Sequence, residues 1–514
     1  MAGVTFKKAP YRPEVLERKM NGFAGRMGGR WGRFPNVPEW YSTSVQLCGI
    51  NPFVSGSARP TNGSPLGRDM KSHAAVAMDH ESLYRESVIT SPSCFMFGIN
   101  GVGKSSTAQT ILYGQAARGI TPGVFNPIKK DEHTKFTEAL GGEVYSFGPG
   151  KTDRFNLLSD GPLGTAAAEI GGQIGQELLE LARDKSIQLV QLLTRTSRGI
   201  PLEDIEDTAL ECLVDDGRER NRRPVTGHLL EAFNTPSERT LGMLGMTTAE
   251  QFHARYQRLG ETIRSMLSGE LGRMLGGEES ITFNPGNPGG WCFDTASVPE
   301  SNTRLLSAAM LASWSSGMDI IDAHWELALH EQRKAEEALE AGELYVPGIK
   351  WRGYSTFMDE FWFPLRACEG IVDRVDRLGR TNRSEGVAEM KATHSPKDLE
   401  SLPNVQDRPK AKGLVERCGL IAVMALTEED LQTLSRIRPM TDDEIRLVRG
   451  FNAAPAWHQP KRRLLKRDGK PNPPPGAGKV LFKVEGRVGI PVKMVQTDVQ
   501  SDNHITDSRF RNQS

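Results

Sequence analysis

Paired cysteines are missing from this sequence, and histidines are few and scattered. The six cysteines form no Cys-x-x-Cys pair, and the ten histidines form no cluster along the chain. This pattern argues against a disulfide framework and against a zinc site. We therefore expect a protein of a reduced, intracellular setting. The cysteines are Cys48, Cys94, Cys212, Cys292, Cys368 and Cys418.

The chain also lacks a net charge and a long apolar run. Its 64 basic residues balance its 64 acidic ones, which argues against a protein that binds nucleic acid over its whole surface but allows a local basic lining. The most apolar stretch, from Gly419 to Leu426, is far too short to cross a bilayer, and the basic, polar start does not resemble a signal peptide. We expect a cytoplasmic protein without an integral membrane span, held at the cytoplasmic face of the inner membrane only through partners.

Short apolar runs alternate with helical patterns over most of the 514 residues. This alternation is typical of an α/β domain with a mostly parallel central sheet. Strands are expected at 94–98, within 142–150, near 291–293, at the YSTFM run before Asp359, at 387–393, and as a closing pair in VLFKVEGRVGIPVKMV.

Between 163 and 275 the alternation gives way to apolar residues at helical spacing, which predicts an all-helical insertion. A charge-dense stretch at 326–343 predicts a projecting hairpin or solvated helix. The expected segments are a flexible, basic and Gly-rich arm at 1–45, the first part of the α/β domain at 46–162, the insertion at 163–275, the second part of the domain at 276–470, and a linker with a small C-terminal β-hairpin at 471–514.

GINGVGKSS, residues 98–106, has the spacing of a phosphate-binding loop, between a strand pattern and a helical pattern. Backbone N–H groups at a helix N-terminus favour a phosphate, Lys104 can reach the β- and γ-phosphate oxygens, and Ser105 can ligate Mg²⁺. The alternative is a glycine-rich turn without a ligand. The expected nucleotide-binding residues are Gly98, Asn100, Gly101, Val102, Gly103, Lys104, Ser105 and Ser106.

Two adjacent carboxylates, Asp359 and Glu360, follow a short apolar run in TFMDEFW. At the end of a strand, both would emerge at the C-terminal edge of the sheet. Asp359 would hold Mg²⁺ through water, and Glu360 would polarise the attacking water as a general base. The alternative is an ordinary acidic helix start, a position that Asp and Glu favour.

His394 follows the predicted strand VAEMKAT, so it would lie next to the γ-phosphate edge together with Thr393. Arginines just upstream include Arg377, Arg380 and Arg383. One of them could neutralise transition-state charge across a subunit boundary, as an arginine finger does, and Arg380 and Arg383 are the candidates. Each could instead be a solvated loop residue or a salt-bridge partner.

The succession of motifs is more specific than the phosphate loop alone. In chain order it contains SPLGRDM, YRESVITSPSCFMFGINGVGKSS, ALGGEVYSFGPGKTDRFNLL, FMDEFW, MKATHSPKDL and GKVLFKVEGRVGIPVKMV. This order, spanning about residues 46 to 508, resembles the conjugal-transfer ATPases of type IV secretion systems. These form the TraC/TrbE-like group in the FtsK–HerA branch of RecA-like P-loop NTPases.

The resemblance implies a RecA-like fold with ATP and Mg²⁺ as cofactors. It also implies that Lys104 and Ser105 bind the nucleotide and Mg²⁺, and that Asp359 and Glu360 are the hydrolytic pair. Members of the group usually form hexameric rings at the cytoplasmic side of a secretion channel. The implied partners are therefore further copies of this chain, the channel components and, as a candidate, DNA.

The sequence departs from the group's pattern at three places. His394 stands where relatives often carry glutamine, and NPIKKDEH, residues 126–133, stands where they usually have an Asp-Pro-Lys loop. The amino-terminal domain that usually precedes the motor is reduced to about 50 residues. We therefore expect contacts with the channel to be made differently or by another chain.

The leading hypothesis is a ring motor that hydrolyses ATP to energise conjugative DNA or protein transfer, or assembly of the apparatus. One alternative is a DNA translocase or coupling ATPase of the same branch, which should show basic pore loops and DNA-stimulated hydrolysis. Another is a nucleotide-gated assembly scaffold with little turnover, against which the intact pair Asp359 and Glu360 argues.

Overall fold

The computed structural model describes most of the chain after residue 58. By their internal contacts, residues 1–58 and residues 59–514 form separate units. In the first unit, β1 (Arg18–Lys19) pairs antiparallel with β2 (Gly22–Phe23). The rest of the arm expected at 1–45 lies outside the described residues, and the division into five segments stays a prediction. In the second unit the described residues are 59–126, 132–285, 287–367, 372, 386–402, 404–452, 476–497 and 500.

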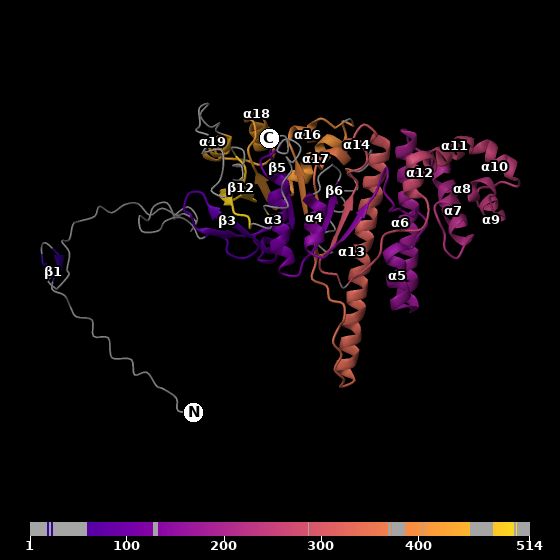
Figure 1. Ribbon diagram of the computed structural model, residues 1–514, viewed down its shortest axis with the longest axis horizontal. Helices are drawn as coiled ribbons and strands as arrows, with labels where there is room; N and C mark the ends of the chain where they lie inside the picture. The colour runs from indigo at the N-terminus through magenta and orange to yellow at the C-terminus, as the bar shows by residue number, and fades with distance from the viewer. Residues whose placement is uncertain are drawn as a thin grey trace. The chain divides into compact units, whose positions relative to one another are not determined.

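One large sheet organises the second unit (Figure 1). Seven of its described strands run parallel, and because their spatial order differs from chain order, β10 lies between β5 and β9. The carboxyl ends of these three strands therefore meet at one edge of the sheet. In spatial order the seven are β11 (Leu420–Val423), β5 (Ser93–Phe97), β10 (Val387–Thr393), β9 (Tyr354–Met358), β6 (Thr121–Asn126), β8 (Trp291–Asp294) and β7 (Glu143–Ser146).

The sheet continues beyond β11 with four antiparallel strands. The expected C-terminal hairpin is present, and it joins the main sheet because its first strand hydrogen-bonds to β11. The mostly parallel α/β fold with this hairpin is thus confirmed. In order from β11, the four strands are β12 (Lys479–Val484), β13 (Ile490–Met494), β3 (Pro65–Asp69) and β4 (Ala75–Ala77).

Strand formation follows burial more closely than sequence pattern. Every residue of β5, β9 and β11 is buried, as expected for parallel strands covered on both faces. The sequence of β6, TPGVFN, does not predict a strand. Gly123 of β6 pairs with Trp291 of β8, and a Cβ there would lie 2.5 Å from the indole ring. The glycine therefore leaves room for the indole, although Thr-Pro-Gly resembles a turn.

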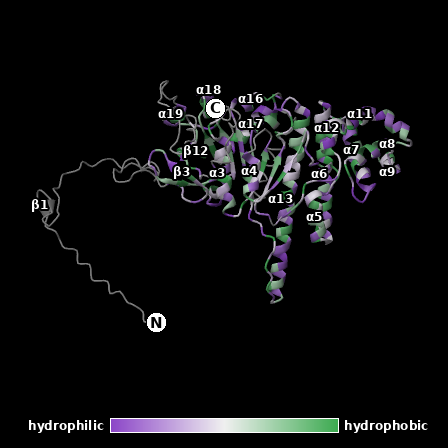
Figure 2. Ribbon diagram, viewed as in Figure 1, coloured by the Kyte–Doolittle hydropathy of each residue, from purple (hydrophilic) through white to green (hydrophobic). Residues whose placement is uncertain are grey.

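Helices connect the strands of the sheet. The expected charge-dense stretch at 326–343 lies mostly in the last turns of α13, where hydrophilic residues predominate (Figure 2). Among the described helices, none combines the length and apolar character needed to cross a membrane. The described connecting helices include α2 (His80–Arg85), α3 (Lys104–Ala116), α4 (Glu132–Ala139), α13 (Thr303–Glu340), α14 (Trp362–Ala367), α16 (Lys397–Glu400), α17 (Asp407–Glu416), α18 (Glu428–Ile437) and α19 (Asp442–Phe451).

The expected all-helical insertion is present between β7 and β8 (Figure 1). It packs on α13 through α5 and α6, where Leu178 shares a small apolar core with Ala323. Lys185 of α6 adds ion pairs to Asp319 at 2.7 Å and Asp322 at 2.5 Å. The helices of the insertion are α5 (Gly161–Ile170), α6 (Gly172–Arg198), α7 (Asp204–Glu219), α8 (Gly227–Asn234), α9 (Glu238–Met243), α10 (Ala249–Arg255), α11 (Gln257–Met266) and α12 (Gly269–Leu275).

Candidate active site

The predicted phosphate loop, residues 98–106, connects the end of β5 to α3. Gly103 is the N-cap of α3 and adopts a φ of 100°, a backbone conformation that a side chain would strain. A Cβ on Gly98 would lie 2.8 Å from Cβ of Met424. Asn100 and Gly101 are exposed at the turn, and Val102 is buried beneath it. The loop thus presents its backbone at the N-terminus of a 13-residue helix, an arrangement that favours an anion.

Lys104, His394 and Glu360 form a hydrogen-bonded chain across the carboxyl ends of β5, β10 and β9. Lys104 Nζ lies 2.8 Å from the Gly98 carbonyl oxygen and 2.8 Å from His394 Nδ1. Because an ammonium group only donates, Nδ1 is the acceptor and the ring carries a proton on Nε2. That Nε2 lies 2.9 Å from Glu360 Oε2. One imidazole therefore joins the lysine of the loop to the predicted general base.

Glu360 is held in a constrained conformation directly after β9. Its φ is 50°, which is uncommon for a residue with a side chain. Its carboxylate is buried and also accepts from Trp362 Nε1 at 2.8 Å. The next residue, Phe361, donates its N–H to the Ala392 carbonyl of β10 at 2.8 Å. The backbone contact fixes the chain beside Glu360, and the contacts from Trp362 and His394 orient its carboxylate.

Asp359 and Ser105 meet on the same side of the loop. The Ser105 hydroxyl donates to Asp359 Oδ2 at 3.0 Å, and both residues are buried. Asp359 Oδ1 accepts the backbone N–H of Glu360 at 3.0 Å. A hydroxyl and a carboxylate beside a phosphate loop are the oxygen donors that Mg²⁺ prefers. The donor set therefore fits a nucleotide with its Mg²⁺ ion.

Glu132, His133 and Gln109 belong to this site, although the sequence motifs do not mark them. Glu132 and His133 open α4, and ligand atoms of these two residues and of Asp359 lie within 4.8 Å of one another. His133 Nε2 is 3.1 Å from Asp359 Oδ2, and Gln109 Nε2 is 3.1 Å from His133 Nδ1. The one sequence signal was the unusual NPIKKDEH segment, which contains Glu132 and His133. Gln109, in α3, carried no such signal.

The C-terminal hairpin also reaches the phosphate loop. The N–H of Gly478 donates to the Val102 carbonyl at 3.1 Å, and the side-chain amide of Gln496 donates to the Ser106 hydroxyl. Ser106, predicted to bind nucleotide, is thus tied to the strand pair. The sequence predicts the hairpin but not this contact.

The other residues predicted at this site are Thr393 and the arginines upstream of β10. Thr393 ends β10, and its hydroxyl donates to Asp398 Oδ2 at 2.9 Å. The arginine candidates Arg377, Arg380 and Arg383 lie outside the described residues, and their role stays a prediction.

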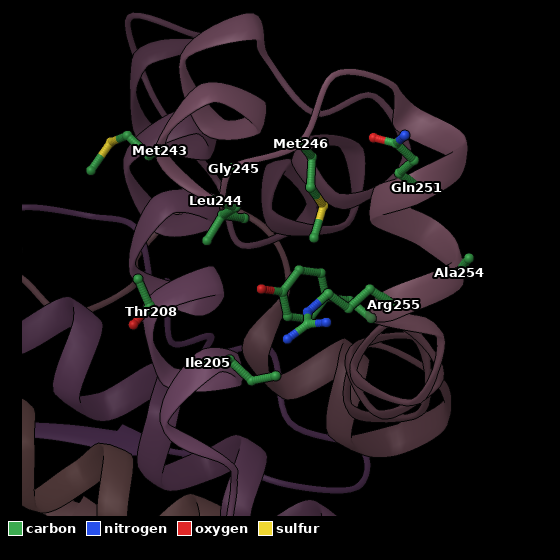
Figure 3. Close-up of a pocket in the computed structure, with 10 residues that line it drawn as sticks. Ile205, Thr208, Met243, Leu244, Gly245, Met246, Gln251, Ala254 and Arg255 are labelled. Carbon is green, nitrogen blue, oxygen red and sulfur yellow. The ribbon is translucent and has the colours of Figure 1, made fainter.

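A separate open pocket lies in the helical insertion (Figure 3). Its lining includes Ile205 of α7, Arg255 of α10, and Met246, which precedes α10. Its lining contains no carboxylate and no histidine, the groups that most often ligate metals or transfer protons. The pocket therefore offers no carboxylate or imidazole that could serve as a general base.

No protein-family model matches the sequence, and no curated protein matches it. Among solved structures, VirB4 of Thermoanaerobacter pseudethanolicus aligns with 86% of this chain and 99% of its own length, with a TM-score of 0.59 and 16% identity. Plasmid coupling protein TrwB in complex with ADP and Mg²⁺ aligns over 90% of this chain and 97% of its own, with a TM-score of 0.45 and 12% identity. This second likeness is too distant to bear on the site.

Three observations support the same fold: the strand order, the position of the predicted phosphate loop between β5 and α3, and the alignment over nearly all of VirB4. The chain therefore has the fold of VirB4, and the resemblance to the type IV secretion ATPases that its motif order indicates is confirmed at the level of the fold.

Proposed function

We propose that this chain is a Mg²⁺-dependent ATPase that works as a hexameric ring motor, as the resemblance in its motif order implies, and that it energises conjugative type IV secretion. The observation that carries the proposal is the meeting of Lys104, His394 and Glu360 at one edge of the sheet. Lys104 lies 290 positions before His394 in the sequence, and the folded chain brings the two side chains together. A purely structural loop would not need this arrangement.

The proposed reaction is attack of water on the γ-phosphorus of ATP, which breaks the bond from that phosphorus to the β–γ bridging oxygen and releases ADP and phosphate. Lys104 leaves its carbonyl partner and His394 to pair with the β- and γ-phosphate oxygens. Glu360 accepts the proton of the attacking water, and Trp362 keeps its carboxylate in place. Bound Mg²⁺, near Ser105 and Asp359, would neutralise charge on the phosphates.

His394 is proposed to sense the nucleotide. In the structure its ring bridges Lys104 and Glu360. Once the lysine turns to the phosphates, Nδ1 is released and the ring can change its contact with Glu360. Binding of ATP at the phosphate loop would thus change the contacts of the general base through one side chain.

The test is replacement of Glu360 by Gln, which keeps the shape of the side chain but removes the base. General-base catalysis contributes roughly 10²- to 10⁴-fold, so hydrolysis should fall by at least about 10² while ATP still binds. Support of DNA transfer in cells by this variant would overturn the motor and favour a nucleotide-gated scaffold. Strong stimulation of wild-type hydrolysis by DNA would favour the coupling-ATPase alternative.

A further inference from the structure

His133 is a buried histidine that contacts the carboxylate expected to serve Mg²⁺. We infer that His133 is a positioning residue for Asp359, and that Gln109 determines which imidazole nitrogen carries the proton; this inference rests on the proposed function. His133 and Gln109 are fully buried, and Asp359 is 1% exposed. In such surroundings a hydrogen bond that is broken and not replaced is costly.

The orientation of the Gln109 amide follows from its backbone contact. Gln109 Nε2 lies 3.0 Å from the carbonyl oxygen of Glu132, which can only accept a hydrogen bond. The amide nitrogen, and not its oxygen, therefore faces this group. The same nitrogen is 3.1 Å from His133 Nδ1, so Nδ1 also accepts.

An imidazole that accepts at Nδ1 carries its proton on Nε2. His133 Nε2 lies 3.1 Å from Asp359 Oδ2, and it therefore donates to the carboxylate. The Ser105 hydroxyl donates to the same oxygen at 3.0 Å. Donors from α3 and α4 thus converge on Oδ2 and hold the carboxylate at the end of β9 in one orientation.

Direct metal ligation by His133 is the competing role, since Glu132, His133 and Asp359 are close enough to hold an ion together. Ligation needs a lone pair on the nitrogen that faces the ion. Nε2 offers an N–H instead, and moving the proton to Nδ1 would set it against the Gln109 amide N–H. His133 therefore acts through Asp359, as outer partners of metal ligands do.

The principal test uses Mn²⁺ as a spectroscopic probe for the cation, bound to the full chain with a non-hydrolysable ATP analogue. Loss of an outer partner typically weakens metal affinity 10- to 100-fold. We expect H133L to weaken Mn²⁺ binding by about tenfold or more. H133Q, which can return an N–H near the position of Nε2, should recover most of the affinity. Unchanged Mn²⁺ affinity in H133L would overturn the inference.

The matched control is H228L. His228 is also buried, its Nδ1 accepts the Val225 N–H at 3.1 Å, and its Nε2 lies 2.8 Å from the side-chain amide of Asn221, but it lies in the helical insertion. This variant should lose thermal stability without losing Mn²⁺ affinity. An equal loss of affinity in H228L would mean that unfolding, and not the contact to Asp359, explains the result for H133L.

Gln109→Leu tests the tautomer and keeps the imidazole, so it remains informative if H133L does not fold. Nitrogen NMR of the histidine-labelled chain should find His133 protonated at Nε2 in the wild type, and this preference should be lost in Q109L. A wild-type signal protonated at Nδ1, or Mn²⁺ bound directly to His133, would contradict the inference.

A double-variant comparison identifies the route of the effect. If His133 acts only through Asp359, H133L should cause no further loss of Mn²⁺ affinity in a D359N background. A full additional loss would overturn the inference. If Mn²⁺ affinity depends on His133 but the chain fails to hydrolyse ATP, the proposed function is refuted and the inference about His133 stands.

Discussion

At the scale of single residues, the site is organised around side chains that hydrogen-bond to one another and to the backbone of the loop. Lys104 donates to the Gly98 carbonyl and to His394, and Glu360 accepts from both His394 and Trp362. Under the proposed function, ATP would replace the contacts of Lys104, and this exchange would carry information from the phosphate to the proposed base Glu360.

Substitution of His394 tests this exchange. His394→Ala removes the bridge between Lys104 and Glu360 and should lower kcat about tenfold or more, the effect expected for losing a hydrogen bond to a charged group. His394→Gln places an amide that can both donate and accept, so it should retain kcat within a few-fold. Steady-state hydrolysis, with ATP affinity measured separately, distinguishes the two, and equal kcat for both variants would argue against the bridge.

The sequence predicted the residues of this site that belong to motifs but not those that join it through folding. Lys104, Ser105, Asp359 and Glu360 follow from spacing and from their position after a strand. His133 does not, because its partners Gln109 and Asp359 lie 24 and 226 positions away and meet only once β6 and β9 pair.

At the scale of elements, strands were predicted where apolar runs are plain. β5, β9 and β10 follow from such runs, whereas β6 was missed because Thr-Pro-Gly favours a turn in isolation. β11 was noticed only as an apolar stretch too short for a membrane. In both cases the neighbouring strands decide the structure: β6 lies between β9 and β8, and β11 lies between β5 and β12.

Gly123→Ala tests the packing of β6 on β8. The new Cβ would lie 2.5 Å from the Trp291 ring, so we expect a loss of about 1–3 kcal/mol in the free energy of unfolding. Gly450→Ala is the control, because nothing lies within 4 Å of its Cβ position on α19. Chemical denaturation measures both, and equal stability of the two variants would contradict the packing account.

Glu279, in the segment between α12 and β8, should make stability depend on pH. Burial raises its pKa to about 8, opposed by a hydrogen bond from the Asn156 N–H. The folded chain therefore keeps a proton that the unfolded chain releases near its ordinary value of 4.5. Stability from this group is full below that value and falls as the pH rises to about 8.

Glu279→Gln should remove this dependence. At a pH above the pKa of Glu279 in the folded chain, the variant should melt on the order of a few °C higher than the wild type. At a pH near the ordinary pKa of glutamate, the two chains should melt at the same temperature. Thermal melting across this range provides the measurement. A constant difference between the two chains at every pH would show that ionisation of Glu279 is not responsible.

At the scale of the whole molecule, the ring hypothesis requires that neighbouring copies complete each other's sites. An arginine finger acts on the nucleotide of the adjacent subunit. A chain with Arg380→Ala and Arg383→Ala would then keep an intact phosphate loop, and a Lys104→Ala chain would keep its arginines. Mixing the two inactive chains should restore part of the hydrolysis.

Mixing Lys104→Ala with Glu360→Gln provides the control for this experiment. Lys104 and Glu360 serve one site within one chain, joined through His394. Such a mixture should therefore stay inactive. Recovery in neither mixture would argue against those two arginines acting between subunits.

The central claim is that the sheet edge around Lys104, His394 and Glu360 hydrolyses ATP. It is tested most directly by the rate of Mg²⁺-dependent ATP hydrolysis, with and without DNA, for wild-type chain and Glu360→Gln of determined oligomeric state. The account predicts hydrolysis by an assembled wild-type chain and a rate lower by at least about 10² in the variant. Equal rates for the two chains, or no hydrolysis by an assembled wild-type chain that binds ATP, would contradict it.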